Sequence, residues 1–183
     1  VQHLELARDT SRKFNAKFGV EYFPEPKPLL TPTRRIMGLD GNAKMSKSLG
    51  NTVGLLESDE EIWQKLRPAM TDPQRVRKSD PGRPEVCNIF QLHKAFSAEP
   101  TVEHVRQQCE TAGWGCMDCK KVLHEGMVQE LTPIRRRAEA LDAEPQRVLD
   151  ALASGAATAR GLAQETMRQV REIVGLDGLA LPA

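Results

Sequence analysis

The sequence predicts a mainly α-helical protein with an irregular, strand-containing segment near its N-terminus. Apolar residues recur at helical spacing over most of the chain, whereas prolines and glycines concentrate in residues 19–54 and 71–84. Aromatic residues make up only 4% of the chain, so Leu, Val, Ile and Ala must build most of the core. A length of 183 residues fits one domain or two small ones. A hydrophobic content of 39% with 28% charged residues is typical of a soluble globular protein.

The first part of the chain combines one helix with extended segments. Apolar residues at helical spacing predict a helix over residues 3–18, which Gly19 would end. Short strands are expected at residues 20–23 and 34–39, and the four prolines between them force an irregular, extended connection. A turn and then a loop rich in Gly, Ser and Lys should follow over residues 40–53.

Helices are expected to dominate the rest of the chain. Ser58 and Glu61 have the spacing of a capping box, which predicts that a helix begins there. A polar linker is expected at residues 74–84, so the chain should divide near residue 75. After the linker, helical spacing predicts helices at 86–97, 101–112, 117–141, 144–153 and 156–174.

Local signals predict where these helices begin, end and bend. Thr101 and Asp142 are suited to be N-caps, because their side-chain oxygens can accept from free backbone N–H groups. Gly113 and Gly155 are suited to end helices. Pro133 lacks a backbone N–H group and should kink or split the helix that contains it.

Charge and hydropathy restrict the class of protein. The net charge is +1, so a nucleic-acid partner would have to bind local basic patches rather than a uniformly basic surface. No apolar run is long enough to span a bilayer, and the polar first residues do not form a signal peptide. We therefore expect a cytoplasmic protein. The chain does not begin with Met and opens directly in a helical pattern, as though a segment upstream were missing.

A lysine–serine loop at residues 44–48, with the sequence KMSKS, is the main functional candidate. Lys44 and Lys47 supply ammonium groups that can bind phosphate oxygens, and Ser46 and Ser48 add hydroxyl donors on a segment that ends at a glycine. Such a loop can close over a triphosphate and stabilise the charge that develops on pyrophosphate. The alternative interpretation is an ordinary solvated basic loop.

The loop and its flanks resemble the tryptophanyl family of class I aminoacyl-tRNA synthetases. The string at 44–48 matches the KMSKS signature of class I. The flanking strings at 35–39, 49–51 and 69–72 (RIMGL, LGN and AMTD) are similar to the tryptophanyl enzymes. Residues 2–9 resemble the helix that follows that family's ATP-contacting Gly-Glu-Asp-Gln motif. The resemblance covers residues 2–175.

This resemblance implies a fold and an activity. Residues 1–74 would form the C-terminal segment of a Rossmann-like catalytic domain, and residues 75–183 a helical tRNA anticodon-binding domain. The activity would be ATP-dependent activation of L-tryptophan, with Mg²⁺, and its transfer to tRNA(Trp) by a homodimer. The family's HIGH-type signature and its tryptophan-binding carboxylate lie upstream of Val1. Because a class I site needs both halves of the nucleotide fold, we expect this chain alone to be inactive.

The resemblance also implies roles for residues of the loop and of the segment before it. Lys44 and Lys47 would bind the ATP phosphates, and Lys47 is the candidate for stabilising the transition state. Ser46 and Ser48 would position the loop, within which Met45 also belongs to the ATP-binding set. Ile36 would pack near the adenine.

Four cysteines predict a metal centre. Cys87, Cys109, Cys116 and Cys119 follow the spacing C-x21-C-x6-C-x2-C, and the last three surround a glycine-rich turn. Four thiolates suit either tetrahedral Zn²⁺ or an iron–sulfur cluster, and the competing interpretation is four unrelated buried cysteines. A subset of bacterial tryptophanyl enzymes carries a [4Fe-4S] cluster with similar spacing, and this resemblance favours [4Fe-4S] over Zn²⁺.

Other residues offer weaker signals. His93 and His104 could replace a cysteine ligand, but a structural or exposed helix histidine is the favoured interpretation for both. Basic clusters at Lys120-Lys121 and Arg135-Arg136-Arg137 are either solvated helix faces or tRNA contacts. Two other functions remain open: a non-catalytic RNA-binding helical module with a metal or Fe–S cluster, and a zinc-stabilised interaction domain. An intact lysine–serine loop argues against the RNA-binding module, which has no use for pyrophosphate chemistry.

Overall fold

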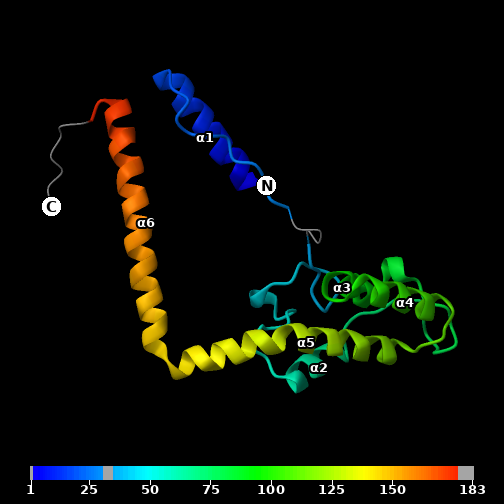
Figure 1. Cartoon of the computed structure of the whole chain (residues 1–183). Coiled ribbons are helices and arrows are strands. Elements are labelled where there is room, and N and C mark those ends of the chain that lie inside the picture. The colour runs from blue at the N-terminus through cyan, green and yellow to red at the C-terminus, as the bar shows by residue number, and fades with distance from the viewer. Residues whose placement is uncertain (1, 31–34, 177–183) are drawn as a thin grey trace. The chain divides into compact units, whose positions relative to one another are not determined.

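The computed structural model describes residues 2–30 and 35–176. Short 3-10 turns lie at Lys47–Leu49 and Pro84–Val86. Within the described ranges there is no β-strand, only an isolated antiparallel bridge between Met37 and Lys44. The α-helices are α1 (Gln2–Phe18), α2 (Asp59–Leu66), α3 (Asn88–Phe96), α4 (Glu99–Glu110), α5 (Cys116–Ala143) and α6 (Pro145–Val174) (Figure 1).

The prediction of a mainly helical protein is confirmed, but the two predicted strands are wrong. Residues 20–23 form no ladder, because Tyr22 and Phe23 instead donate their backbone N–H groups to the side-chain oxygen of Asn15. Residues 35–39 belong to a narrow hairpin in which the Met45 N–H donates to the Ile36 carbonyl. Residue 34 lies outside the described residues.

Two predicted breaks between helices, a split at Pro133 and a stop at Gly155, are absent. α5 continues through Pro133 and α6 continues through Gly155. In α5 the hydroxyl of Thr132 donates to the Val128 carbonyl at 2.6 Å, one residue before the carbonyl that Pro133 leaves without its helical donor. An interior glycine costs only about 1 kcal/mol relative to alanine, and the long helical segments on both sides of Gly155 outweigh that cost.

The predicted N-caps at Thr101 and Asp142 are wrong as well. α4 begins after Ala98 and α6 begins after Glu144. In both helices a proline lies in the first turn, where its missing N–H group costs nothing and its fixed φ favours the helix. The proline signal therefore overrides the polar N-cap signal. The capping box of α2 is present as predicted, with Ser58 accepting from the Glu61 N–H.

The described chain divides into two compact units. One unit contains α1, the residues after it up to Leu30, and α6; the other runs from residue 35 to Ala143. The expected division near residue 75 does not coincide with this boundary, because α2 lies before residue 75 and yet packs on α5. In the described part of the chain, no helix has the length and apolar character needed to cross a membrane.

In the unit of residues 35–143, α5 packs against α2, α3 and α4. Their apolar faces meet in one core, in which Ile62, Leu66 and Leu123 have no exposed surface and Phe90 is 1% exposed. Burying each such side chain contributes about 1.5–3 kcal/mol. This core fixes the first half of α5, and with it the positions of the cysteines and of the loop supports described below.

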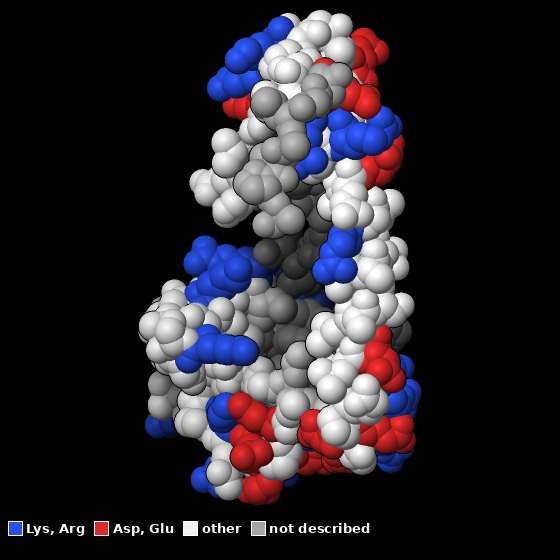
Figure 2. Space-filling view, turned by 90° about the vertical axis from the view of Figure 1, so that its left-hand side faces the viewer, with Lys and Arg blue, Asp and Glu red and all other residues white. Residues whose placement is uncertain are grey.

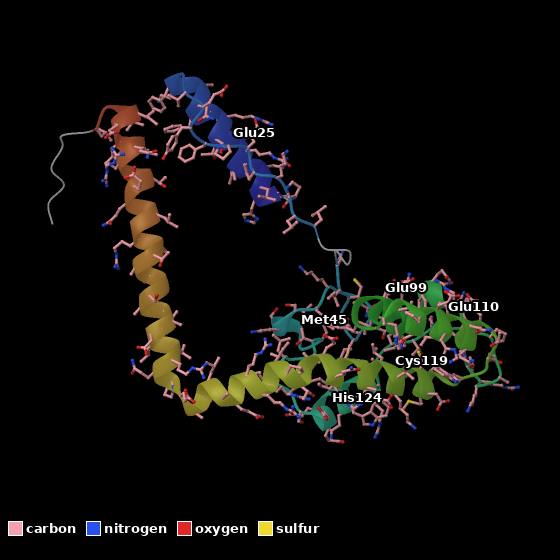
Figure 3. All side chains as sticks on the ribbon, in the orientation of Figure 1. Glu25, Met45, Glu99, Glu110, Cys119 and His124 are labelled. Atoms are coloured by element: carbon pink, nitrogen blue, oxygen red, sulfur yellow. The ribbon has the colours of Figure 1, made fainter. Side chains whose placement is uncertain are left out.

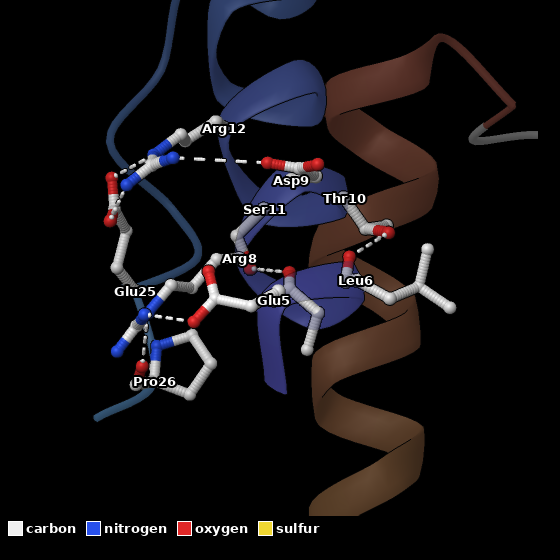
Figure 4. A network of polar contacts seen from close by, with 10 residues as sticks. Glu5, Leu6, Arg8, Asp9, Thr10, Ser11, Arg12, Glu25 and Pro26 are labelled. Atoms are coloured by element: carbon white, nitrogen blue, oxygen red, sulfur yellow. Dashed lines mark hydrogen bonds and ion pairs between the residues drawn. The ribbon is translucent and has the colours of Figure 1, made fainter. Parts of the chain in front are cut away.

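In the other unit, contacts between α1 and residues 19–26 replace a buried core. The ring of Phe14 lies 4.9 Å from that of Phe23. The guanidinium of Arg12 donates twice to Glu25, at 2.7 Å each, and Arg8 donates to the Pro26 carbonyl (Figure 4). Because these polar contacts are largely exposed, each contributes little to stability.

Candidate functional site

The lysine–serine loop extends from a hairpin over residues 36–45. The Gly38 N–H donates to the Ala43 carbonyl at 2.8 Å, and Gly41 takes a φ of +69° at the tip. A positive φ favours glycine because it has no Cβ atom. After the hairpin, the 3-10 turn at Lys47–Leu49 ends at Gly50, which has a φ of +64°. The two glycines thus delimit the loop.

Asn51 braces this loop from the interior. Its side chain is buried, and its Oδ1 accepts from the Ser46 N–H at 2.8 Å while its Nδ2 donates to Asp40 at 3.2 Å. A Cβ atom on Gly38 would lie 2.0 Å from the Asn51 Nδ2, so this close approach requires glycine. Sequence reasoning missed both roles, although both residues lie in the quoted flanking strings.

The loop presents its polar side chains and anchors its apolar one. Lys44 and Lys47 are exposed, and the hydroxyls of Ser46 and Ser48 lie 2.8 Å apart. Met45, labelled in Figure 3, instead lines a cavity of about 540 Å³ with residues of α3 and α5. The loop can therefore offer two ammonium groups to an anion while Met45 holds it against the core. Ile36 also packs against the core.

The four cysteines come from three helices. Cys87 precedes α3, Cys109 lies in the last turn of α4, and Cys116 and Cys119 lie in the first turn of α5. Burial raises the pKa of Cys87, but the N–H groups of Phe90 and Ile89, at the start of α3, act in the opposite direction. Backbone amides directed at a sulfur favour its thiolate form.

The cysteines lie close enough to influence one another. Burial raises the pKa of Cys119 to about 12, and repulsion from Cys87, Cys109 and Cys116 adds to this effect. The Nη1 of Arg75 lies 3.9 Å from the Cys109 Sγ, and a Cβ on Gly82 would lie 2.5 Å from that sulfur. Four cysteines next to a cation and a glycine-lined wall supply the sulfur donors that a thiolate-bound metal uses, and a bound metal would have to displace the protons of the thiols.

No three His, Cys, Asp or Glu side chains are already arranged around a common metal position within residues 2–30 and 35–176. The cysteines therefore lie near one another without forming a finished coordination sphere. We call Cys87, Cys109, Cys116 and Cys119 the cysteine cluster.

The two histidines have structural roles, as favoured from the sequence. His93 has no exposed surface, and its ring nitrogens lie 2.8 Å from the Ser97 hydroxyl and 3.2 Å from the Cys119 carbonyl. Burial lowers its pKa. The ring of His104 packs edge-on against Trp114, with the ring centroids 4.9 Å apart.

The basic clusters are only partly available to a partner. Lys120 is 4% exposed, and its ammonium donates to the carbonyls of Arg67 and Ala69. The expectation that Lys120 contacts tRNA is therefore wrong in this structure. Arg135 donates to the Glu57 carbonyl and pairs with Asp59, so it ties α5 to the start of α2.

Lys121, Arg136 and Arg137 are exposed. On the face shown in Figure 2, basic side chains lie in separate groups with acidic and uncharged residues between them. This distribution agrees with local patches rather than a continuous basic surface.

The loop between α2 and α3 is held by an ion pair between buried Asp72 and exposed Arg83, which makes its stability pH-dependent. Asp72 accepts two hydrogen bonds from the Arg83 guanidinium and one from the Arg83 N–H. These contacts, with that from the Gln74 N–H, lower the pKa of Asp72 to about 2 from its usual 3.8. Because the folded-state pKa is depressed, the stabilisation is complete above about pH 4 and is lost as the pH falls toward 2.

We therefore expect Asp72→Asn to lower the free energy of unfolding at neutral pH by about 1.5–3 kcal/mol, the contribution of hydrogen bonds to a charged group. Near pH 2 the variant and the parent should converge. Urea unfolding followed from about pH 6 to about pH 2 measures both effects. Asp142→Asn, at an exposed position in the last turn of α5, is the matched control. A variant that keeps the parent's pH dependence would contradict this role of Asp72.

Comparison with known proteins identifies the family. The family described as "tRNA synthetases class I (W and Y)" matches residues 1–132. A tryptophan–tRNA ligase from Deinococcus radiodurans is 53% identical over 176 residues, which cover 96% of this chain and 53% of that protein. One from Aquifex aeolicus is 41% identical over 177 residues, which cover 96% of this chain and 44% of that protein.

Solved structures agree. The crystal structure of tryptophanyl-tRNA synthetase from Campylobacter jejuni complexed with ADP and tryptophan is similar with a TM-score of 0.74. It is 32% identical and covers 96% of this chain and 54% of that one. The chain spans about half the length of the curated relatives it matches. The chain therefore belongs to the class I tRNA synthetases of the tryptophan and tyrosine family.

Proposed function

We propose that the protein to which this chain belongs is a tryptophan–tRNA ligase. It would activate L-tryptophan with ATP and Mg²⁺ to give tryptophanyl-adenylate and pyrophosphate, and then transfer the aminoacyl group to tRNA(Trp). The observation that carries this proposal is the lysine–serine loop, with two exposed ammonium groups on a buried Asn51 brace. The similarity to tryptophan–tRNA ligases over 96% of this chain supports it.

In this function the loop acts on the phosphates of ATP. As the carboxylate of tryptophan attacks the α-phosphate, the bond to pyrophosphate breaks and negative charge grows on the leaving group. Lys47 would stabilise this charge, and Lys44 would hold the phosphates in place. Ser46 and Ser48 would position the loop, Met45 would anchor it in its apolar cavity, and Ile36 would pack near the adenine.

We assign residues 1–74 to the C-terminal segment of a Rossmann-like catalytic domain and residues 75–183 to a helical anticodon-binding domain. The enzyme would work in the cytoplasm as a homodimer. α2 and the loop supports belong to the first assignment and the cysteine cluster to the second. Residues from both assigned domains pack in one hydrophobic core. The proposed domain boundary therefore lies inside a single packed unit.

The cysteine cluster would hold a [4Fe-4S] cluster, with Zn²⁺ as the alternative. Cys87, Cys109, Cys116 and Cys119 are the ligands, and Arg75 would offset part of the negative charge of their thiolates. The bound group would supply a structural cross-link among α3, α4 and α5. In that role it takes no part in tryptophan activation.

Activity assays test this function directly. The protein from the whole reading frame is expected to catalyse tryptophan-dependent exchange of pyrophosphate into ATP, with tyrosine as the control amino acid. The chain of residues 1–183 alone should not, because the residues that bind tryptophan and the base of ATP are contributed by both halves of a class I site. Robust exchange by the chain alone, or a preference for tyrosine, would refute the proposal as stated.

Binding of tRNA is expected to depend on the exposed arginines of α5. An Arg136/Arg137→Ala double variant should weaken tRNA affinity roughly tenfold and reduce the salt dependence of binding by about one or two phosphate contacts. Arg135→Ala should instead lower stability, because Arg135 ties α5 to α2. Filter binding at several salt concentrations measures the effect. An unchanged affinity for tRNA would exclude the surface that carries Arg136 and Arg137. Exposed Lys121 is also assigned to tRNA binding.

A further inference from the structure

The cysteine cluster and the lysine–serine loop are joined by buried polar residues. Five polar or charged side chains are buried in the described ranges: Asn51, Asp72, Asn88, His93 and Lys120. Two of them, Asn88 and Lys120, directly follow the cysteines Cys87 and Cys119 in the sequence. Both side chains donate to main-chain carbonyls of segments that support the loop.

Lys120 holds the segment that follows α2. Its ammonium donates to the Arg67 and Ala69 carbonyls, at 2.7 Å each. The Ala69 carbonyl belongs to the same planar peptide group as the Met70 N–H, which donates to the Leu39 carbonyl at 3.0 Å. Lys120 and the loop hairpin therefore form hydrogen bonds to the carbonyl and the N–H of one rigid peptide group.

Asn88 reaches the same hairpin from α3. Its Nδ2 donates to the Gly38 carbonyl at 2.8 Å in a fully buried contact. The next residue, Leu39, donates its N–H to the Asn51 carbonyl at 3.0 Å. The Asn51 side chain then holds the Ser46 N–H at 2.8 Å. Both paths thus start next to a cysteine, meet at Gly38 and Leu39 of the hairpin, and reach the backbone of the loop through Asn51.

We propose that Asn88 and Lys120 are positioning residues that make the placement of the lysine–serine loop depend on the cysteine cluster. A group bound by Cys87 and Cys119 fixes the start of α3 and the first turn of α5. Asn88 and Lys120, which follow these cysteines, then fix Gly38 and Ala69 through their hydrogen bonds. Without a bound group, the same contacts hold the loop less tightly. The consequence for catalysis rests on the ATP role proposed above, but the physical link does not.

Hydrogen exchange tests the link on the chain itself. Lys120→Met keeps the aliphatic stem and removes the ammonium, so the amides of Met70 and Ser46 should exchange roughly 10- to 100-fold faster, as expected for a lost buried charged donor. Lys121→Met, at the neighbouring exposed lysine, is the matched control. Unchanged exchange at Met70 and Ser46 in Lys120→Met would overturn the proposal.

General destabilisation is separated by the amides of α4, since the hydrogen bonds of Lys120 go to Arg67 and Ala69. If Lys120→Met also speeds their exchange, the milder Lys120→Gln variant decides. Faster exchange confined to Met70, Ser46 and their hairpin supports the proposal, whereas a uniform increase overturns it. Removing the metal from the parent with a chelator should speed exchange at Met70 and Ser46 as Lys120→Met does, and should also speed exchange in α4, which carries the ligand Cys109. If the loop amides exchange at the same rate with and without metal, the placement of the loop does not depend on the cysteine cluster, and the proposal is overturned.

The catalytic consequence is measured in the protein from the whole reading frame. Lys120→Met and Asn88→Leu should each lower kcat for ATP–pyrophosphate exchange roughly tenfold and leave KM for tryptophan unchanged, because the loop acts on phosphates. Faster loop exchange with normal kcat would support the link and overturn the ATP role of the loop. An unchanged loop together with a lower kcat would overturn the link instead.

Discussion

Replacing Lys47 with alanine in the protein from the whole reading frame is expected to reduce kcat for ATP–pyrophosphate exchange by roughly 10²–10³-fold. Removing one preorganised group that stabilises transition-state charge has about this effect in other enzymes. Lys47 meets the structural requirements, because it is exposed and lies on a 3-10 turn held by Gly50 and by the brace at Ser46. KM for tryptophan should change little, since Lys47 would act on the leaving pyrophosphate.

The comparison with Lys44 refines this result. Lys44 forms the backbone bridge with Met37, so the hairpin fixes its backbone, whereas Lys47 lies on the 3-10 turn. Lys44→Ala should therefore raise KM for ATP more than it lowers kcat. Lys94→Ala, at an exposed lysine on α3, is the control for a general loss of positive charge. Equal, small effects of Lys44→Ala and Lys47→Ala would show that the loop is only a solvated basic segment.

The signature of the loop could be found from the sequence, but its support could not. The string at 44–48 identifies the ammonium and hydroxyl groups of the loop, and glycine at position 50 predicts a turn. The brace depends on the buried Asn51 side chain passing 2.0 Å from where a Cβ of Gly38 would lie, and this contact exists only after the hairpin has formed. Local patterns describe short-range geometry, whereas tertiary packing decides which polar group becomes buried.

Lys120 shows the same limit more strongly. A lysine beside another lysine predicts a solvated surface, and most lysines are exposed. Here α5 packs against α2, and the ammonium of Lys120 binds the carbonyl of Arg67, the C-cap residue of α2, and that of Ala69 beyond the helix. The strand predictions failed for a related reason. Residues 20–23 bond to the Asn15 side chain, and residues 35–39 form a short hairpin whose backbone also bonds to Met70 and Asn88 instead of to a ladder partner.

The cysteine cluster should produce the second large effect. Cys119→Ser is expected to abolish stoichiometric metal binding and to lower the free energy of unfolding by roughly 3–5 kcal/mol, because metal binding contributes directly to folding. Cys119 is the most informative position, since its pKa responds to all three other cysteines. Metal analysis and urea unfolding of anaerobically purified protein measure the two effects.

Met117→Ser provides the control, because Met117 is exposed on the same helical turn and is no candidate ligand. It should keep the metal and the stability of the parent. The nature of the metal then distinguishes the two candidate sites. Brown protein with iron and sulfide supports [4Fe-4S], whereas colourless protein with one zinc per chain supports a zinc site. Metal-free protein whose stability is unaffected by Cys119→Ser would show four unrelated cysteines. In that case the hydrogen bonds of Asn88 and Lys120 would support the loop without a bound group, and the proposed dependence on the cysteine cluster would be wrong.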